Sequence, residues 1–471
     1  MQNFVHLHVH SQYSILDGQA SIARLVDKAM ADGMPGIALT DHGNMFGVKE
    51  FYNYVKKQNG KRRDKIKDLK KLLAALEGLL AEHSDAAAYL ADRKLELLKL
   101  DTHKDPTPEA AIAPTKLEAH VKQVEAMDKE FGFSPATARE KIAKLEALPD
   151  FKPIIGCEVY VARRALHLKD KSHKEDQGGY HLILLAKNEK GYHNLIKIVS
   201  KAWTEGFYMR PRTDRTELEK YHEGLICCSA CLGGEIPKRI TNDQMAEAEE
   251  AVQWYKRVFG EDYYLELQLH KATVARANHE AYPMQLKVNE QLKKLADKYD
   301  IKLICTNDVH FVDEENAEAH DRLICLSTGK DLDAPKRMLY SKQEWLKTRE
   351  EMEKIFGDVP EAMANTVDIC NQVEHYSIDH APIMPTFAIP EEFGPEAEYR
   401  ARLTEKDLFD EFTRDENGNV VMSEEDAHKK IERLGGYDKL YRIKFEADYL
   451  AHLTFIGAKK RYGDPLSEEV R

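Results

Sequence analysis

Three histidines alternate with apolar residues close to the start of the chain, in the stretch HLHVHS at residues 6–11. In an extended strand successive side chains point to opposite faces, so the three histidines would share one face and the apolar residues the other. A single histidine in a strand is most often a surface residue or a hydrogen-bonded core residue. Three on one face would repel one another when protonated, and a shared metal ion removes that repulsion, because neutral imidazole is a common ligand of zinc-like ions.

More side chains that bind metals follow at or near the ends of other apolar runs. The stretch LTDHGNMFG supplies Asp41 and His42, and Glu158 is a charged residue inside the otherwise apolar run IIGCEVYV. A buried carboxylate without a partner is unfavourable, and a cation is the usual remedy. With ILDG, GGYHLIL, CCSACLGG and TNDVHF, and with His6 and Asp41 not counted, the candidates comprise five imidazoles, three carboxylates and one thiol. This mixed set predicts two or three metal ions in a cluster with bridging carboxylates.

Some candidates have open alternatives. The alternative for Asp17 in ILDG is a turn residue before glycine. His181 begins its apolar run, far from the expected site unless the strand starts earlier or the histidine bends inward, and His270 in ELQLH is left out of the set. Arg210 and Arg212 in YMRPR are candidates for holding a DNA phosphate, since guanidinium matches its oxygens in a fork. The alternative for these two arginines is a surface pair around a proline.

Seven short apolar runs alternate with amphipathic helical stretches in the first 330 residues. This alternation favours a parallel sheet, most economically closed into a seven-stranded barrel whose site lies at the carboxyl ends of the strands. The predicted strands cover residues 4–10, 36–40, 153–161, 181–186, 225–229, 263–269 and 302–307.

Two regions depart from this pattern. Residues 56–150 contain long charged helices with leucines at helical spacing, which predicts a helical insertion with one buried stripe and a turn at residues 105–114. Its start, KRRDKIKDLKK, is either a solvated helix face or a nucleic-acid contact. We assign residues 1–55 and 151–330 to the barrel. Residues 331–471 are expected to form a linker and the truncated start of a second, mainly helical region.

Composition restricts the class of protein. The 471 residues predict two or three domains, and no apolar run approaches the roughly 20 residues of a membrane span. Without a signal peptide the protein is expected to be cytoplasmic, with its seven cysteines as reduced thiols. The pair Cys228 and Cys231 is only weak evidence for a zinc ribbon, since no second pair follows. The net charge of -12 does not suggest nucleic-acid binding, although a local basic groove would suffice.

The motifs HLHVHSQYSILDG, ALTDHGNMFG, IIGCEVYV, YHLILLAKN, SACLGGEI and TNDVHF resemble those of the PHP (polymerase and histidinol phosphatase) domain family. Their order and wording are most similar to the N-terminal part of the alpha subunits of bacterial DNA polymerase III. GFYMRPRTD and PKRMLYSKQEW also resemble that group. The resemblance implies a distorted seven-stranded barrel of α/β class, with a trinuclear metal site. It places the ligands on His8, His10, Asp17, His42, Glu158, His181, Cys231, Asp308 and His310, with His6 behind them.

The resemblance also implies an activity. Two or three divalent ions, zinc or manganese with magnesium also possible, would activate a metal-bound water for phosphodiester hydrolysis at a DNA 3′ end, as a proofreading 3′-5′ exonuclease. The implied partners are DNA, the rest of the polymerase alpha subunit and other replisome subunits, with no membrane. Two alternatives remain: a non-catalytic, metal-stabilised scaffold and a free-standing small-molecule phosphatase. Polymerisation itself is not expected of this chain alone, because no paired-aspartate motif follows Asp331.

Overall fold

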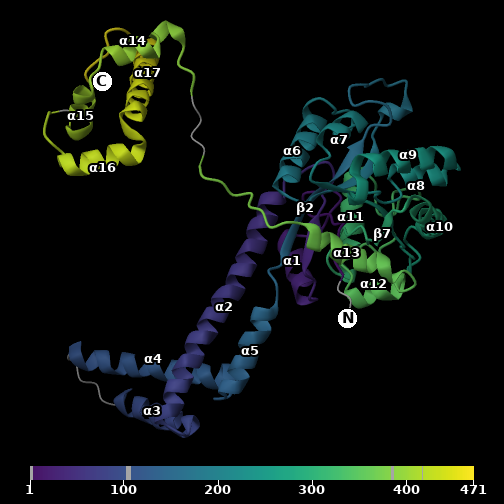
Figure 1. Cartoon of the computed structure of the whole chain (residues 1–471), viewed down its shortest axis with the longest axis horizontal. Helices are drawn as coiled ribbons and strands as arrows, with labels where there is room; N and C mark the ends of the chain where they lie inside the picture. The colour runs from purple at the N-terminus through teal and green to yellow at the C-terminus, as the bar shows by residue number, and fades with distance from the viewer. Residues whose placement is uncertain (1–3, 102–107, 383–386, 416, 471) are drawn as a thin grey trace. The chain divides into compact units, whose positions relative to one another are not determined.

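The computed structural model describes residues 4–101, 108–382, 387–415 and 417–470. Contacts divide the chain into two compact units, Met1–Asp379 and His380–Arg471. The first unit holds the sheet and the helical insertion, and the second is helical (Figure 1). Within the described residues, no helix combines the length and the apolar character needed to cross a bilayer. All predicted site residues belong to the first unit.

The first unit is built on one mixed sheet. Six strands follow one another in the order β1-β2-β3-β5-β6-β7, and β4 pairs with β2 beside this path. The strands are β1 (Gly36–Leu39), β2 (Lys152–Val161), β3 (Tyr180–Ala186), β4 (Arg212–Thr213), β5 (Leu225–Cys228), β6 (Tyr263–Leu267) and β7 (Lys302–Cys305). Six of the seven predicted apolar runs are strands, which confirms the α/β class. The short β4 has no counterpart in the sequence pattern.

The first predicted strand, residues 4–10, is not a strand of the sheet. Its backbone nevertheless bonds to both sheet edges. The Ala38 N–H of β1 donates to the carbonyl oxygen of His6 at 2.9 Å, and the His10 N–H donates to that of Val309, which follows β7, at 2.7 Å. The segment therefore joins the two edges and closes the curve of the sheet.

A bend at His8 breaks the regular alternation of this segment. Val5 and Leu7 pack among strand residues in the interior cluster, whereas Val9 packs in the outer core against the helices. Before the bend, the odd-numbered side chains of Val5 and Leu7 point to the interior. From the bend onward, the side chains of His8 and His10 point there instead. The prediction of strict alternation is wrong here, because the bend replaces one pleat of the strand.

Strand β3 runs antiparallel to both of its neighbours, β2 and β5. The other paired strands are parallel. The prediction of a parallel sheet is therefore wrong at β3. A parallel connection needs a crossover, usually an α-helix, and the chain between β2 and β3 contains only the three-residue turn η1 (Lys174–Asp176). As a result β3 begins where β2 ends, with Tyr180 paired to Val161.

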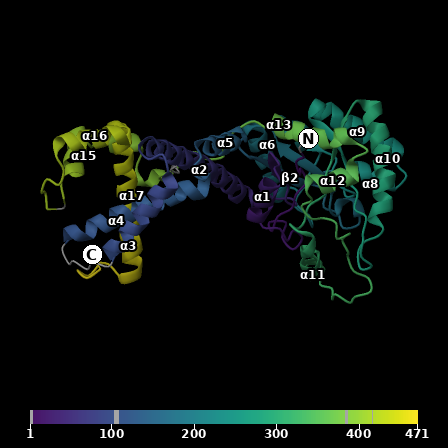
Figure 2. The same cartoon turned by 90° about the horizontal axis from the view of Figure 1, so that it is seen from below.

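Helices cover the outer face of the sheet, where α8, α9 and α10 lie side by side (Figure 2). At the interior, Ile369, Cys370 and Val373 at the end of α13 pack among the strand residues. The first unit consequently reaches Asp379, beyond the boundary expected after residue 330. Its helices outside the insertion are α1 (Ile22–Ala31), α6 (Glu189–Thr204), α7 (Arg215–Tyr221), α8 (Glu235–Thr241), α9 (Met245–Phe259), α10 (Ala281–Tyr299), α11 (Ala317–Thr328), α12 (Arg349–Phe356) and α13 (Pro360–Gln372), with 3-10 turns η2 (Gly260–Asp262) and η3 (Glu314–Asn316).

The insertion consists of α2 (Val48–Glu82), α3 (Ala86–Asp101), α4 (Pro108–Phe131) and α5 (Pro135–Ala147). Helix α2 begins inside the barrel core and continues into the insertion, where it contacts α4 and α5. The predicted leucine stripe is present, with Leu69 and Leu76 buried in a separate cluster. Of the predicted turn, residues 105–107 lie outside the described residues, and the remainder is helical. At the basic start of the insertion, Arg62 and Arg63 both pair with Asp150.

The second unit has a small apolar core of its own, built from Leu408, Ile431 and Leu440. Its elements are η4 (Glu391–Phe393), α14 (Glu396–Ala401), α15 (Glu405–Thr413), α16 (Glu424–Leu434) and α17 (Gly436–Tyr462). The mainly helical character predicted for this region agrees with these elements.

Candidate metal centre

Glu158 in β2 lies at the centre of the predicted site and is fully buried. Its carboxylate oxygens are 2.7 Å from Nδ1 of His181, 3.4 Å from Nε2 of His8 and 3.5 Å from Nε2 of His10. They also pair with Nδ1 of His42. One buried acid thus contacts four imidazoles that arrive from the first segment, the loop after β1 and the start of β3.

Asp308, in the loop after β7, supplies a second carboxylate to the same histidines. Its Oδ1 is 3.1 Å from Nε2 of His8 and 3.3 Å from Nε2 of His10. The backbone of Asp308 has a φ of 46°, in the left-handed region that aspartate enters more readily than most residues. Two residues later His310 faces the same cluster, with Nδ1 2.7 Å from the carbonyl oxygen of Asp308.

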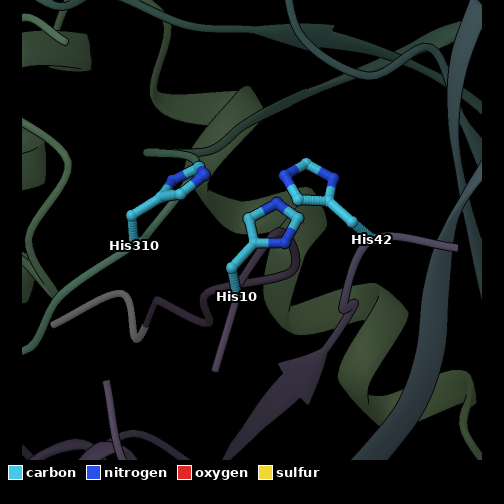
Figure 3. Close-up of side chains that lie close together, drawn as sticks. All are labelled: His10, His42 and His310. Carbon is cyan, nitrogen blue, oxygen red and sulfur yellow. The ribbon is translucent and has the colours of Figure 1, made fainter. Parts of the chain in front are cut away.

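The rings of His10, His42 and His310 face one another (Figure 3). The ring centre of His10 is 4.0 Å from that of His42 and 4.5 Å from that of His310. Asp17 lies beside them, with Oδ2 3.0 Å from Nε2 of His42. The hydroxyl of Tyr340 donates to Oδ1 of Asp17 at 2.8 Å, so this carboxylate belongs to the site rather than to a simple turn.

The antiparallel direction of β3 explains why His181 reaches the site from the head of its strand. His181 pairs with Tyr160 near the end of β2, so the start of β3 and the end of β2 share one edge. Neither an earlier strand start nor an inward bend is needed. Gly233 permits the close approach of the neighbouring loop, because a Cβ atom there would lie 2.9 Å from the ring of His181.

Cys231 comes from that same loop after β5. Its Sγ is 3.6 Å from Nδ1 of His181 and 3.8 Å from a carboxylate oxygen of Glu158. The Gly233 N–H donates to this sulfur at 3.4 Å. All seven cysteines are free thiols, as predicted, and Cys231 is the one that joins the cluster. The structure therefore brings all nine predicted residues together.

Three groups of these side chains could each hold a metal ion, with the ligand atoms of a group within 4.8 Å of one another. The groups are His10, His42 and His310; His8, His10 and Glu158; and His42, Glu158 and His181. Several of the buried polar atoms in the cluster make no hydrogen bond within the described chain, although they lie within ion-pair distance of one another: Nε2 of His8, Nε2 of His10, Nδ1 of His42, Oε2 of Glu158 and Oδ1 of Asp308. Buried polar atoms normally have a partner. A divalent ion satisfies imidazole nitrogens and carboxylate oxygens together, so the donor set fits such ions.

Electrostatics favour the ligand form of the central acid and oppose that of the thiol. Burial tends to raise the pKa of Glu158, but the adjacent His181 and His42 hold it well below its usual range. Burial raises the pKa of the Cys231 thiol well above its usual value, and the carboxylates of Asp308 and Glu158 add to the effect. The thiol therefore needs a nearby cation before it can bind as a thiolate.

Sequence reasoning missed Glu266 in β6, which orients a predicted ligand. Its Oε1 is 2.7 Å from Nδ1 of His8, on the ring edge opposite the Nε2 that faces the cluster. The side chains of Thr306 and Gln268 donate to the same oxygen at 2.5 and 3.0 Å. Glu266 could have been found, because it is a charged residue inside an apolar run, as Glu158 is.

Ser14 and Asp41 form another supporting pair. The Ser14 hydroxyl is 3.0 Å from Nδ1 of His10 and donates to Oδ1 of Asp41 at 2.7 Å. Asp41 also accepts from the Ser11 backbone N–H at 2.7 Å. Asp41 therefore acts through Ser14 and fixes the loop that carries His10.

Two expectations from the sequence are wrong. His6 does not support the site, because its Nε2 is 2.8 Å from the carbonyl oxygen of Lys347 on the other face of the segment. Arg212 does not face a phosphate, because it is fully buried. Its guanidinium donates to four backbone carbonyl oxygens, those of Gly206, Leu166, Leu168 and Asp176.

A cavity of about 200 Å³ lies against the cluster, and its wall includes His42, His181, Cys231, Asp308 and His310. Tyr340 and His270 also line it. His270 stands apart from the nine, since its Nε2 lies 3.1 Å from the carbonyl oxygen of Asn307. The cavity gives a small ligand access to the predicted metal centre.

Comparison with known families agrees with this geometry. The family model described as PHP domain matches residues 6–108 and 108–270, which together take in more than half of the chain. The chain belongs to the PHP domain family. This family is metal-dependent, and the curved mixed α/β sheet is consistent with its barrel fold.

The chain is also similar to proteins named DNA polymerase III subunit alpha. It is 35% identical over 406 residues to that of Borreliella burgdorferi, which covers 85% of this chain and 26% of the relative. The identity is 31% over 466 residues for Treponema pallidum, with 98% and 30% covered, and 31% over 416 residues for Thermus aquaticus, with 85% and 25% covered. The chain therefore spans less than a third of the length of these relatives.

Proposed function

We propose that this chain is a metal-dependent phosphodiesterase that removes nucleotides from a DNA 3′ end, as the PHP-bearing N-terminal part of a replicative DNA polymerase subunit. The observation that carries the proposal is the convergence of nine metal-competent side chains, five of which line one cavity, with buried nitrogen and oxygen atoms that make no hydrogen bond within the described chain. The similarity to polymerase subunits supports DNA as the substrate class. Other subunits of the polymerase assembly are the proposed partners.

The residues proposed to hold the ions are His8, His10, Asp17, His42, Glu158, His181, Cys231, Asp308 and His310. Two or three ions suit this number of donors; the imidazoles and the thiol suit zinc, and the carboxylates suit manganese. When bound, the ions supply Lewis-acid activation of water and neutralise charge on the phosphate.

The chain's own residues hold this arrangement in place. Glu266 and Ser14 fix the ring orientations of His8 and His10 from behind, a role that commonly tunes metal ligands. Tyr340 holds Asp17 through its hydroxyl and lines the cavity. Arg210 is exposed, lies 5.6 Å from the ring centre of Tyr160 near His42, and is the remaining arginine proposed to contact a DNA phosphate.

The test uses the purified full chain with Mn²⁺ or Zn²⁺ on a 3′-labelled single-stranded oligonucleotide and, in parallel, on a small phosphomonoester. Release of the labelled nucleotide, lost in His10→Ala and kept in a control His193→Ala at an exposed helix position, is the expected result. Bound metal without hydrolysis of either substrate would favour a scaffold. Hydrolysis of the phosphomonoester alone would favour a small-molecule phosphatase.

A further inference from the structure

Three aromatic side chains form an exposed patch, which we call the aromatic platform: Phe46, Trp203 and Phe207. They are 57%, 41% and 46% exposed. The ring centre of Trp203 is 6.1 Å from that of Phe46 and 5.4 Å from that of Phe207, with which it is stacked at 19°. Single exposed apolar residues are common on proteins, but contiguous ones mark binding surfaces.

The platform is fixed directly to the metal centre. The indole N–H of Trp203 donates at 2.8 Å to the carbonyl oxygen of Gly43, the residue after His42. Gly43 has a φ of 61°, and a Cβ atom there would lie 2.7 Å from Pro211 and 3.0 Å from the ring of Tyr160. This tight packing places the platform at the rim where His42 enters the site.

The loop that carries Phe46 is held by its own hydrogen bonds. The Asn44 side-chain amide donates to the carbonyl oxygens of Tyr13 and His42, each at 2.9 Å. Its Oδ1 accepts from the Phe46 backbone N–H at 3.0 Å. Phe46 is therefore presented to solvent by an ordered turn, so binding a ligand there needs little further ordering.

A positively charged side chain, Arg210, lies on the same part of the surface as the loop that carries His42. Arg210 is exposed and lies 5.6 Å from the ring centre of Tyr160, which is stacked near His42 at 6.2 Å. Across the described parts of the chain it has no ion-pair partner. Tyr160 packs against Gly43, which Trp203 contacts, so Arg210 and the aromatic platform are linked through these two residues. An exposed guanidinium and exposed aromatic rings suit a ligand that has both flat rings and negative charge.

We propose that the aromatic platform binds the unpaired bases of a single DNA strand, with Arg210 on a phosphate of the same strand. The proposal rests on the proposed function, because it assigns to the metal centre a substrate that arrives as a single strand. Bases stack on aromatic side chains with little dependence on sequence, and this stacking is available only when the bases are not paired. An apolar protein surface would use the rings but would leave Arg210 without a partner.

The test measures binding rather than hydrolysis. The full chain is titrated with a phosphorothioate oligothymidylate, which resists hydrolysis, while tryptophan fluorescence and anisotropy of a dye on the oligonucleotide are recorded. Trp203 is the exposed one of three tryptophans, since Trp345 is buried and Trp254 half-buried. We expect saturable quenching in the wild type, loss of most of it in Trp203→Phe, and binding in that variant within about threefold of wild type because the ring remains.

Alanine variants test the other two rings. Phe46→Ala and Phe207→Ala are each expected to weaken binding about tenfold, and Phe207→Tyr to restore it. Leu286→Ala, which removes a 46% exposed leucine from α10, is the matched control and should bind as the wild type does. A blunt duplex of equal length should bind at least tenfold more weakly than the single strand.

The proposal is overturned if the single strand binds without quenching Trp203, or if the alanine variants bind it as tightly as the wild type. It is equally overturned if those variants instead change self-association in sedimentation, which would make the patch a protein contact. Hydrolysis of an unmodified 3′-labelled strand, measured in parallel, separates the two ideas. Quenching without hydrolysis defeats the proposed function alone, and hydrolysis that is insensitive to the rings defeats the platform alone.

Discussion

The metal centre and the helical insertion use charged residues in opposite ways. At the centre, Glu158 and its histidines are buried, and their charges face one another inside the protein. In the insertion the leucines are buried and the ion pairs lie outside, as in Arg139 with Glu77, whose side chains are 64% and 44% exposed. Buried charges interact strongly but depend on every partner, whereas exposed pairs are screened by water. Deleting a charge should therefore have a large effect in one region and a small effect in the other.

The largest effect is expected for Glu158→Gln. The change removes an acid that contacts four imidazoles, and breaking such a buried arrangement costs about 3–5 kcal/mol of unfolding free energy. Bound metal, measured by elemental mass spectrometry, should fall by at least one ion per chain, and DNA hydrolysis should be lost. Glu77→Gln is the control for a glutamate at the surface. Full metal content in Glu158→Gln would contradict the proposed ligand set.

The next largest effect is expected for metal removal, which should lower the stability of the barrel but not that of the insertion. Ions present at 1,000 times their dissociation constant would stabilise the barrel by about 4 kcal/mol, so a chelator should lower the urea midpoint of the barrel. Hydrogen exchange in α2 beyond the barrel core and in α5 should not change, because their cluster contains no metal ligand. Equal loss of protection in both regions would mean that the insertion is not an independent core.

The converse change is Leu76→Ala, which empties a fully buried position in the insertion. Such a truncation costs about 2–5 kcal/mol. The loss should appear as faster hydrogen exchange in α2 and α5, with the metal content of the barrel unchanged. Lower metal occupancy in this variant would show that the insertion supports the site.

A smaller effect is expected for Glu266→Gln, which keeps the shape of the side chain but weakens its interaction with Nδ1 of His8. Replacing a group that orients a metal ligand typically lowers metal affinity 10–100-fold. Competition with a coloured chelator should show this shift, with the full number of ions regained at high metal concentration. Unchanged affinity would mean that Glu266 serves only the packing of β6.

The smallest effect is expected for Arg139→Ala at the surface of the insertion. An exposed ion pair contributes about 0–1 kcal/mol, less at high salt. Urea unfolding at low and high ionic strength measures it. A loss above 2 kcal/mol would be outside the range for a surface pair and would erase the contrast between the two regions.

Much of the fold followed from local patterns, and the exceptions have physical causes. Six apolar runs became strands because each is short, apolar and bounded by helical or turn residues. The first run did not, since a bend at His8 interrupts it. The direction of β3 was also missed, because strand direction depends on how a connection returns through space. The residues of β3 and of the connection before it do not by themselves indicate how the chain returns to the sheet.

The site shows the same division between residue type and surroundings. Glu158 was found as a charge inside an apolar run, and Glu266 meets the same criterion but was passed over. Arg212 looked like a phosphate ligand beside Arg210, yet carbonyl oxygens from distant segments surround its guanidinium. Burial and hydrogen-bond partners of this kind arise only when the chain has folded.

The sequence by itself determined which residues can bind metals and which runs carry them, because donor atoms and apolar periodicity are properties of single residues and their neighbours. Only the tertiary structure decided that His181 shares an edge with Glu158, that His6 faces away and that Trp203 bonds to Gly43 beside His42. Those facts depend on strand direction, on one bend and on contacts between segments far apart in the chain, and no local pattern encodes them.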